Sequence, residues 1–153
     1  DGDSLTMLLI DGDPQQPRQA VVIHMFYLPI AGYTPLDETA TNATIRYMVF
    51  STDDGRLVGI YSGAGFVHPK QTPGEEELEV SAWQATLTLS DASVGFNDVL
   101  GRTQMTGRFV MKNDSAATIE GVRRINRQIS DRLGYPMTVE LGPRPQIAWF
   151  QSQ

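Results

Sequence analysis

The chain has 153 residues, of which 41% are hydrophobic and 20% charged, and its 12 basic and 18 acidic residues give a net charge of −6. This length suits one domain, residues 1–153, and the composition excludes wholesale disorder. Because the chain has no cysteine, it can form no disulfide, thiolate metal site or cysteine nucleophile. No run of about 18 apolar residues occurs, so the sequence predicts no transmembrane helix.

The first two thirds of the chain alternate short apolar runs with turns rich in glycine and proline, a layout typical of an all-β fold. Asp54-Gly55 between two such runs predicts a β-hairpin. Gly59, Gly63 and Gly65 inside one run indicate a bulge or a close approach of two backbones. After a polar leader, residues 1–4, the first four predicted strands are residues 5–10, 20–28, 43–50 and 56–67.

Two segments between predicted strands, residues 29–42 and 68–78, are polar and longer than the usual connection of about 4–6 residues. We therefore predict long loops there. Residues 80–89 and 105–111 alternate apolar and polar side chains, which predicts two half-buried strands. In the first of these, Trp83 would share the apolar face with Ala85, Leu87 and Leu89.

The apolar spacing then changes to that of a helix, residues 115–133. Asn113, Asp114 and Ser115 offer N-cap side chains, and Gly134 is a suitable C-terminal cap. Residues 137–141 and 147–150 complete about eight strands. We expect an all-β protein, a β-sandwich of mostly antiparallel strands with the C-terminal helix packed on it; an α+β sheet with the helix on one side is the alternative.

Candidate site residues fall in the predicted turns. His68 precedes Pro69 at a strand end, where loops often carry function. Asp53 and Asp54 lie together in the predicted hairpin turn, where carboxylates could ligate Ca²⁺, although turns also favour Asp for conformational reasons. No other metal or cofactor is expected. No serine-nucleophile or phosphate-binding motif occurs, so the sequence predicts no catalytic residue.

A second candidate site lies on the predicted helix, where Arg123, Arg124 and Arg127 fall largely off the apolar stripe. Glu120 is placed to pair with Arg124. Residues 1–101 hold 4 basic and 14 acidic residues, whereas residues 102–153 hold 8 basic and 4 acidic residues. An anionic partner would therefore meet the helix first. The net negative charge argues against a nucleic-acid partner.

Without a catalytic set, the sequence favours a non-catalytic binding or interaction module for an unknown protein or small-molecule ligand. A chain that begins at Asp1, lacks cysteine and opens on a polar leader fits an exported bacterial domain of the periplasm or cell envelope, including a lipoprotein; a soluble cytoplasmic domain is the alternative. Two other classes stay open: a hydrolase that uses loop carboxylates with His68, and a structural or oligomerisation domain.

Overall fold

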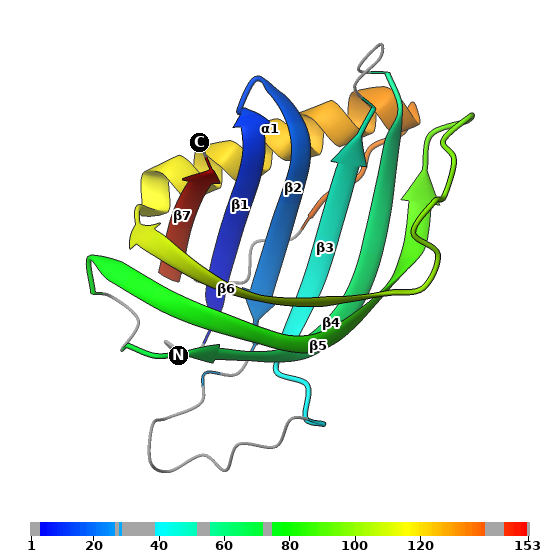
Figure 1. Ribbon diagram of the computed structural model, residues 1–153. Helices are drawn as coiled ribbons and strands as arrows, with labels where there is room; N and C mark the ends of the chain where they lie inside the picture. The colour runs from blue at the N-terminus through cyan, green and yellow to red at the C-terminus, as the bar shows by residue number, and fades with distance from the viewer. Residues whose placement is uncertain are drawn as a thin grey trace.

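Six strands of the chain form one antiparallel sheet in which sequence neighbours pair (Figure 1). The computed structural model describes residues 4–26, 28, 39–51, 56–71, 75–139 and 146–152. A further strand, β7 (Gln146–Ser152), pairs parallel with β1 and meets the end of β6, so the strand order closes on itself. The six antiparallel strands are β1 (Leu5–Asp13), β2 (Gln16–Met25), β3 (Ala43–Phe50), β4 (Val58–Pro69), β5 (Glu77–Ala92) and β6 (Thr103–Asn113).

The sheet is strongly curled, so that β5 and β6 cross in front of a wall made by β1 to β4 (Figure 1). The pairing of β4 with β5 shifts between Ala64 and Phe66, and the pairing of β5 with β6 shifts between Ala82 and Ala85. Such bulges bend a strand and increase its twist. Gln84 lies within the second bulge and has a φ of 46°. These irregularities let β5, the longest strand, fold over the wall.

Two glycines of β4 allow β5 to approach closely, as the sequence predicts. A Cβ atom on Gly63 would collide with the carbonyl oxygen of Thr86, and one on Gly65 would lie 2.5 Å from the Cβ atom of Ala85. Both collisions involve backbone or the root of a side chain, which cannot swing away. The curl therefore depends on the absence of side chains at these two positions.

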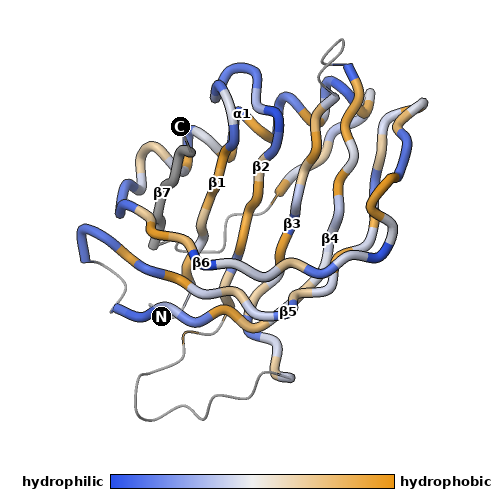
Figure 2. Tube along the Cα trace, in the orientation of Figure 1, coloured by the Kyte–Doolittle hydropathy of each residue, from blue (hydrophilic) through white to orange (hydrophobic). Residues whose placement is uncertain are grey.

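The wall separates two apolar cores. Leu5, Met7 and Ile23 belong to an inner core, between the wall and β5–β6. Leu8 and Val22 belong to an outer core, which lies against the helix α1 (Ser115–Leu133). Figure 2 shows the middle of the wall strands as hydrophobic and the β1–β2 turn as hydrophilic. β1 is buried on both faces over residues 5–10, which explains its nearly continuous apolar run.

The helix begins and ends where the sequence predicts. The Asp114 side chain caps it by accepting a hydrogen bond from the Ala117 N–H at 2.9 Å, and Gly134 ends it with a φ of 78°. Val122, Ile125 and Ile129 are its buried apolar side chains. Among the described residues, no helix is long and apolar enough to cross a membrane.

The predicted β-sandwich of eight strands is wrong, because the strands form one curled sheet instead of two packed ones. In the predicted strand 137–141, the described residues 137–139 form no strand. Ser130 on α1 bonds both the N–H and the C=O of Met137, at 2.9 and 3.1 Å, and Asn126 does the same for Val139, at 2.8 and 3.3 Å. Helix side chains therefore satisfy the backbone groups that a neighbouring strand would otherwise bond.

The two predicted loops fare differently. Of residues 29–42, most lie outside the described residues. The connection predicted at 68–78 is shorter than expected, because His68 and Pro69 end β4 and Glu77 begins β5. The leader prediction falls largely on residues 1–3, which also lie outside the described residues.

Candidate functional site

Cross-strand pairing arranges the inner face of the sheet in rows. One row runs from Met7 through Ile23, Ile45 and Gly63 to Leu87, and its side chains are completely buried. The inner core is therefore filled at this level. The next row towards the β1–β2 turn consists of Leu9, Val21, Tyr47, Tyr61 and Leu89.

In that second row, Val21, Tyr47 and Leu89 are only partly buried. The curled sheet is thus filled at one end and open at the other. We call the open end the mouth and define it by the partly buried apolar residues around it. These are Val21, Tyr47, Val49, Leu89, Phe96, Met105 and Phe109.

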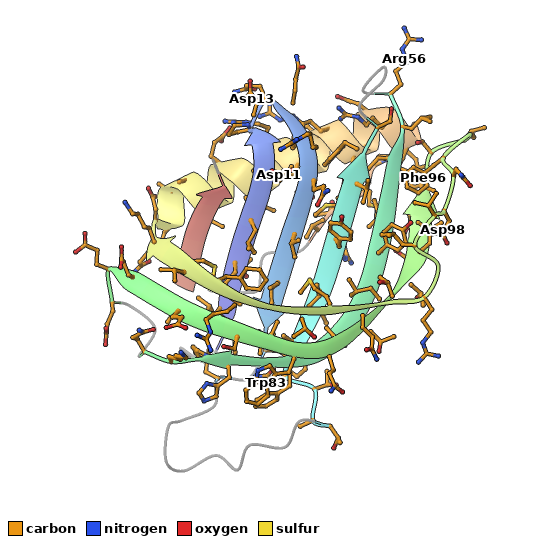
Figure 3. The ribbon with its side chains drawn as sticks, viewed as in Figure 1. Asp11, Asp13, Arg56, Trp83, Phe96 and Asp98 are labelled. Atoms are coloured by element: carbon orange, nitrogen blue, oxygen red, sulfur yellow. The ribbon has the colours of Figure 1, made fainter. Side chains whose placement is uncertain are left out.

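The two sides of the mouth differ in polarity. Asp11 and Gln19 pair at the β1–β2 end, and Figure 3 shows Asp11 and Asp13 near the turn between these strands. On the far side, a Cβ atom on Gly59 would collide with the ring of Phe96. The missing side chain at Gly59 therefore lets Phe96 fold back from the β5–β6 loop and pack against the inner core.

A pocket of about 160 Å³ lies on the polar side of the mouth. An engineered apolar cavity of similar size, about 150 Å³, binds benzene. Within the described residues, β6 pairs only with β5 over residues 103–111, and β7 meets it at Lys112 and Asn113. Phe109 of β6 lies opposite β1 and β2, because it lines the pocket together with residues of both strands. The pocket is lined by Leu9, Ile10, Asp11, Gln19, Ala20, Val21 and Phe109.

Asp11, Arg18 and Tyr47 are polar groups at the β1–β2 side of the mouth. Asp11 accepts a hydrogen bond from Arg18 at 2.9 Å. Burial, and then the charge of Asp11, raises the pKa of Tyr47. The ring of Tyr47 lies 6.0 Å from that of Tyr61, centroid to centroid. At neutral pH the Tyr47 hydroxyl is therefore protonated and can donate or accept a hydrogen bond.

Tyr61 is completely buried, and its hydroxyl donates a hydrogen bond of 2.6 Å to Asp98 in the β5–β6 loop. Burial, and then this hydrogen bond, raises the pKa of Tyr61 to about 12. The hydrogen bond from Tyr61 lowers the pKa of Asp98, and the Gly101 and Leu100 N–H groups add to the effect. Asp98 therefore stays ionised and ties the loop to the wall.

His68 does not lie in the mouth. Its ring is parallel to that of Trp83, with the centroids 6.4 Å apart, and Trp83 also packs on Phe66. Neither Phe66 nor Trp83 belongs to the inner core, so the predicted placement of Trp83 on the face of Ala85 is wrong. The reason is the bulge between Ala82 and Ala85, which breaks the alternation that the prediction assumed.

The carboxylate that lies closest to His68 along the paired strands is already engaged. Glu79 accepts hydrogen bonds from Lys70 at 2.7 Å and forms an ion pair with Arg108 at 3.1 Å. The Lys70 hydrogen bond lowers the pKa of Glu79. In the part of the chain that the structure describes, no hydrogen bond joins His68 to a carboxylate. Asp53 and Asp54 lie outside the described residues.

The three predicted arginine residues lie together on α1, behind the wall and apart from the mouth. Arg124 and Arg127 contact Glu120 at 3.7 and 3.6 Å, and Arg123 is exposed. The predicted pairing of Glu120 with Arg124 is confirmed. The structure thus groups the arginines with each other but not with His68, and an anionic partner for them stays a prediction.

The sequence reasoning missed the mouth itself. Tyr47 and Tyr61 lie in predicted strands, but the sequence does not indicate that the two strands pair so that both side chains lie on one face. Asp98 carried a usable signal, because an Asp followed by Gly three residues later is typical of a loop in which the carboxylate bonds the following N–H groups. The register that brings Phe109 opposite β1 and β2 has no signal in a single sequence.

Taken together, the fold and the mouth define a curled, closed β-sheet with one helix on its outer face and an apolar opening on its inner face. Among the described residues, no cluster of three or more His, Asp or Glu could hold a metal ion. Comparison with protein-family models, with curated proteins and with solved structures gave no match.

Proposed function

We propose that the protein is a non-catalytic binding module that holds a small apolar molecule, or one apolar group of a larger molecule, in the mouth. The observation that carries the proposal is the pocket of about 160 Å³ between Phe109 and the ends of β1 and β2. Apolar pockets with a few polar groups at the opening of a closed sheet are typical ligand sites.

The size of the pocket limits the ligand. The pocket is open to solvent, so its volume of about 160 Å³ bounds only the part of the ligand that is buried in it, which we expect to be one ring or a short branched chain. Two of the residues that line the pocket are polar, Asp11 and Gln19. Asp11 is already bonded by Arg18, so the Gln19 amide is the group that we expect the ligand to meet. We therefore expect a ligand with one apolar ring or branch and one hydrogen-bonding group.

The remaining functional predictions stand as proposals with less structural support. A hydrolase that uses His68 would need a free carboxylate beside the imidazole, and the neighbouring Glu79 is bound by Lys70 and Arg108. An oligomerisation domain would use a free strand edge, and in the described part of the chain residues 103–111 of β6 pair on one side only. Export to a bacterial periplasm or envelope, including lipoprotein attachment, remains our proposal for the location, with the cytoplasm as the alternative.

Titration with benzene, followed through the methyl signals of the isotope-labelled protein, tests the proposed site. We expect the Leu9 and Val21 methyl signals to shift. The methyl signals of Val122 and Ile129, outer-core residues of α1 that do not line the pocket, should stay in place. A Val21→Phe variant places a phenyl ring in the pocket and should weaken benzene binding at least about tenfold, because the ring occupies a volume that only one benzene fills.

Thr44→Phe is the matched control, since Thr44 is exposed on the neighbouring strand β3 and does not line the pocket. It should bind benzene as the unchanged protein does. Near-ultraviolet circular dichroism shows whether each variant keeps its fold. Equal benzene binding by a folded Val21→Phe variant, or the absence of shifts at Leu9 and Val21 in the unchanged protein, would refute the proposed site.

A further inference from the structure

Exposed apolar side chains gather at one end of the molecule. We call residues 93–101, between β5 and β6, the tip. Val94 is 99% exposed, Val99 77% and Leu100 41%. Tyr135, 47% exposed, joins them because its hydroxyl bonds Asp91 at the base of the tip, at 3.0 Å. Only two other large apolar residues in the described part of the chain are comparably exposed, Phe26 and Val110.

The tip is held rigidly by bonds to the wall. Ser93 bonds Val58 through both its backbone N–H and its hydroxyl, and the Phe96 N–H donates to the Ser93 C=O at 3.0 Å. Asp98 Oδ1 accepts from the Tyr61 hydroxyl and from the Gly101 N–H at 2.9 Å. The exposed side chains are therefore presented by a preformed loop, so docking would cost little ordering entropy.

The tip carries one charge, and the residues on either side of it, Asp91 and Arg102, carry one each. Asp98 is the only charged residue in 93–101, and the bonds of its Oδ1 atom are all to the protein itself. Protein interfaces surround their apolar centre with a polar rim that gives specificity. Val94, Val99 and Leu100 offer no directional group, so they suit a fluid apolar phase better than a specific pocket. A tyrosine beside them matches the residues found at the headgroup level of membranes.

We propose that the tip docks on the surface of a lipid bilayer with uncharged headgroups. Val94, Val99 and Leu100 enter the acyl boundary, and Tyr135 lies at the level of the headgroups. Figure 3 shows the loop, with Phe96 and Asp98 labelled, at the edge of the sheet beyond β4. The net charge of −6 opposes binding to anionic lipid, so phosphatidylcholine is the expected surface. The proposal does not depend on a ligand in the mouth.

Because the chain has no cysteine, a single introduced cysteine can be labelled uniquely. A Val99→Cys variant carrying the fluorophore NBD should become brighter with phosphatidylcholine vesicles and should be quenched by spin-labelled lipid. Val110→Cys is the matched control, because Val110 is a 50% exposed valine on β6 outside the tip. The label at position 110 should respond to neither vesicles nor quencher.

A second experiment measures the contribution of the valines by vesicle co-sedimentation. The double variant Val94→Asp with Val99→Asp should lower the amount bound to phosphatidylcholine at least about tenfold, whereas Val110→Asp should leave it unchanged. Both sites are exposed, so the fold should survive, and thermal unfolding checks this. The proposal is overturned if the double variant binds phosphatidylcholine vesicles as the unchanged protein does, or if vesicles do not change the fluorescence of NBD at position 99. A pocket of another protein would then be the expected partner of the tip.

Discussion

The hydrogen bond between Tyr61 and Asp98 provides the sharpest test of how the tip is held. Tyr61→Phe removes one hydroxyl from a completely buried ring and leaves the apolar contacts in place. The acceptor is open to water, so we take the value of an ordinary hydrogen bond, about 1 kcal/mol. For a chain of this length, that loss should lower the melting temperature by about 2–4 °C.

The same bond predicts a pH dependence. The folded-state pKa of Tyr61, about 12, lies above its ordinary value of 10.0. A raised pKa stabilises the folded state fully below the unfolded pKa, and this stabilisation is lost as the pH rises through the folded pKa. The stability of the unchanged protein should therefore fall between about pH 10 and pH 12. Tyr47, whose pKa is also raised, contributes in the same direction.

Urea unfolding of both proteins at neutral and alkaline pH separates the two tyrosines. Subtracting the Tyr61→Phe curve cancels the contribution of Tyr47 and leaves that of Tyr61. The difference in unfolding free energy should favour the unchanged protein at pH 7, shrink as the pH rises above about 10 and change sign before pH 12, because ionising the buried Tyr61 costs the folded state more than the hydrogen bond contributes. Equal stability of the two proteins at pH 7, or a difference that stays constant across the alkaline range, would refute the role assigned to the bond.

Three further substitutions test the backbone features that shape the sheet and the helix. Gly63→Ala should lower the unfolding free energy by about 1–3 kcal/mol, because its Cβ would meet the Thr86 carbonyl oxygen; a neutral effect would contradict the close approach. Gln84→Gly should raise stability in urea unfolding by about 0.5–1 kcal/mol, because the left-handed φ of 46° costs a non-glycine residue about 1–2 kcal/mol and the larger entropy loss of glycine offsets only part of this; a loss would show that the side chain matters more. Asp114→Ala should cost about 1 kcal/mol, whereas Asp114→Ser should retain most of the cap to Ala117.

Local patterns predicted the helix and most strands because their signals lie within a few neighbouring residues. Asp114 and Gly134 marked the helix ends, and the alternation around Phe109 marked β6. The strand predicted at 137–141 failed because its apolar alternation is also compatible with an extended segment that bonds Asn126 and Ser130. Sequence alternation does not reveal whether a partner strand or a helix side chain satisfies the backbone.

The error at Trp83 and the missed mouth share one physical cause. A bulge adds a residue to one strand, so side chains beyond it change faces. No glycine or proline marks the bulge at Gln84, which holds its positive φ without the residue type that usually signals one. Once the face of β5 changes, the strands curl into one closed sheet instead of two packed layers, and the open end appears where β6 crosses β1 and β2.

The open end of the sheet also explains why the tip and the mouth are structurally linked. At the level of Met7 and Leu87, large side chains fill the interior, and the backbones close over Gly63. At the level of Gly59, the wall supplies no side chain, and Phe96 is brought back from the tip to occupy part of the space. The tip therefore forms one side of the mouth and is also a projecting loop. If the tip docks on a bilayer through Val94 and Val99, the mouth lies beside the acyl phase. A small apolar ligand is most concentrated in that phase.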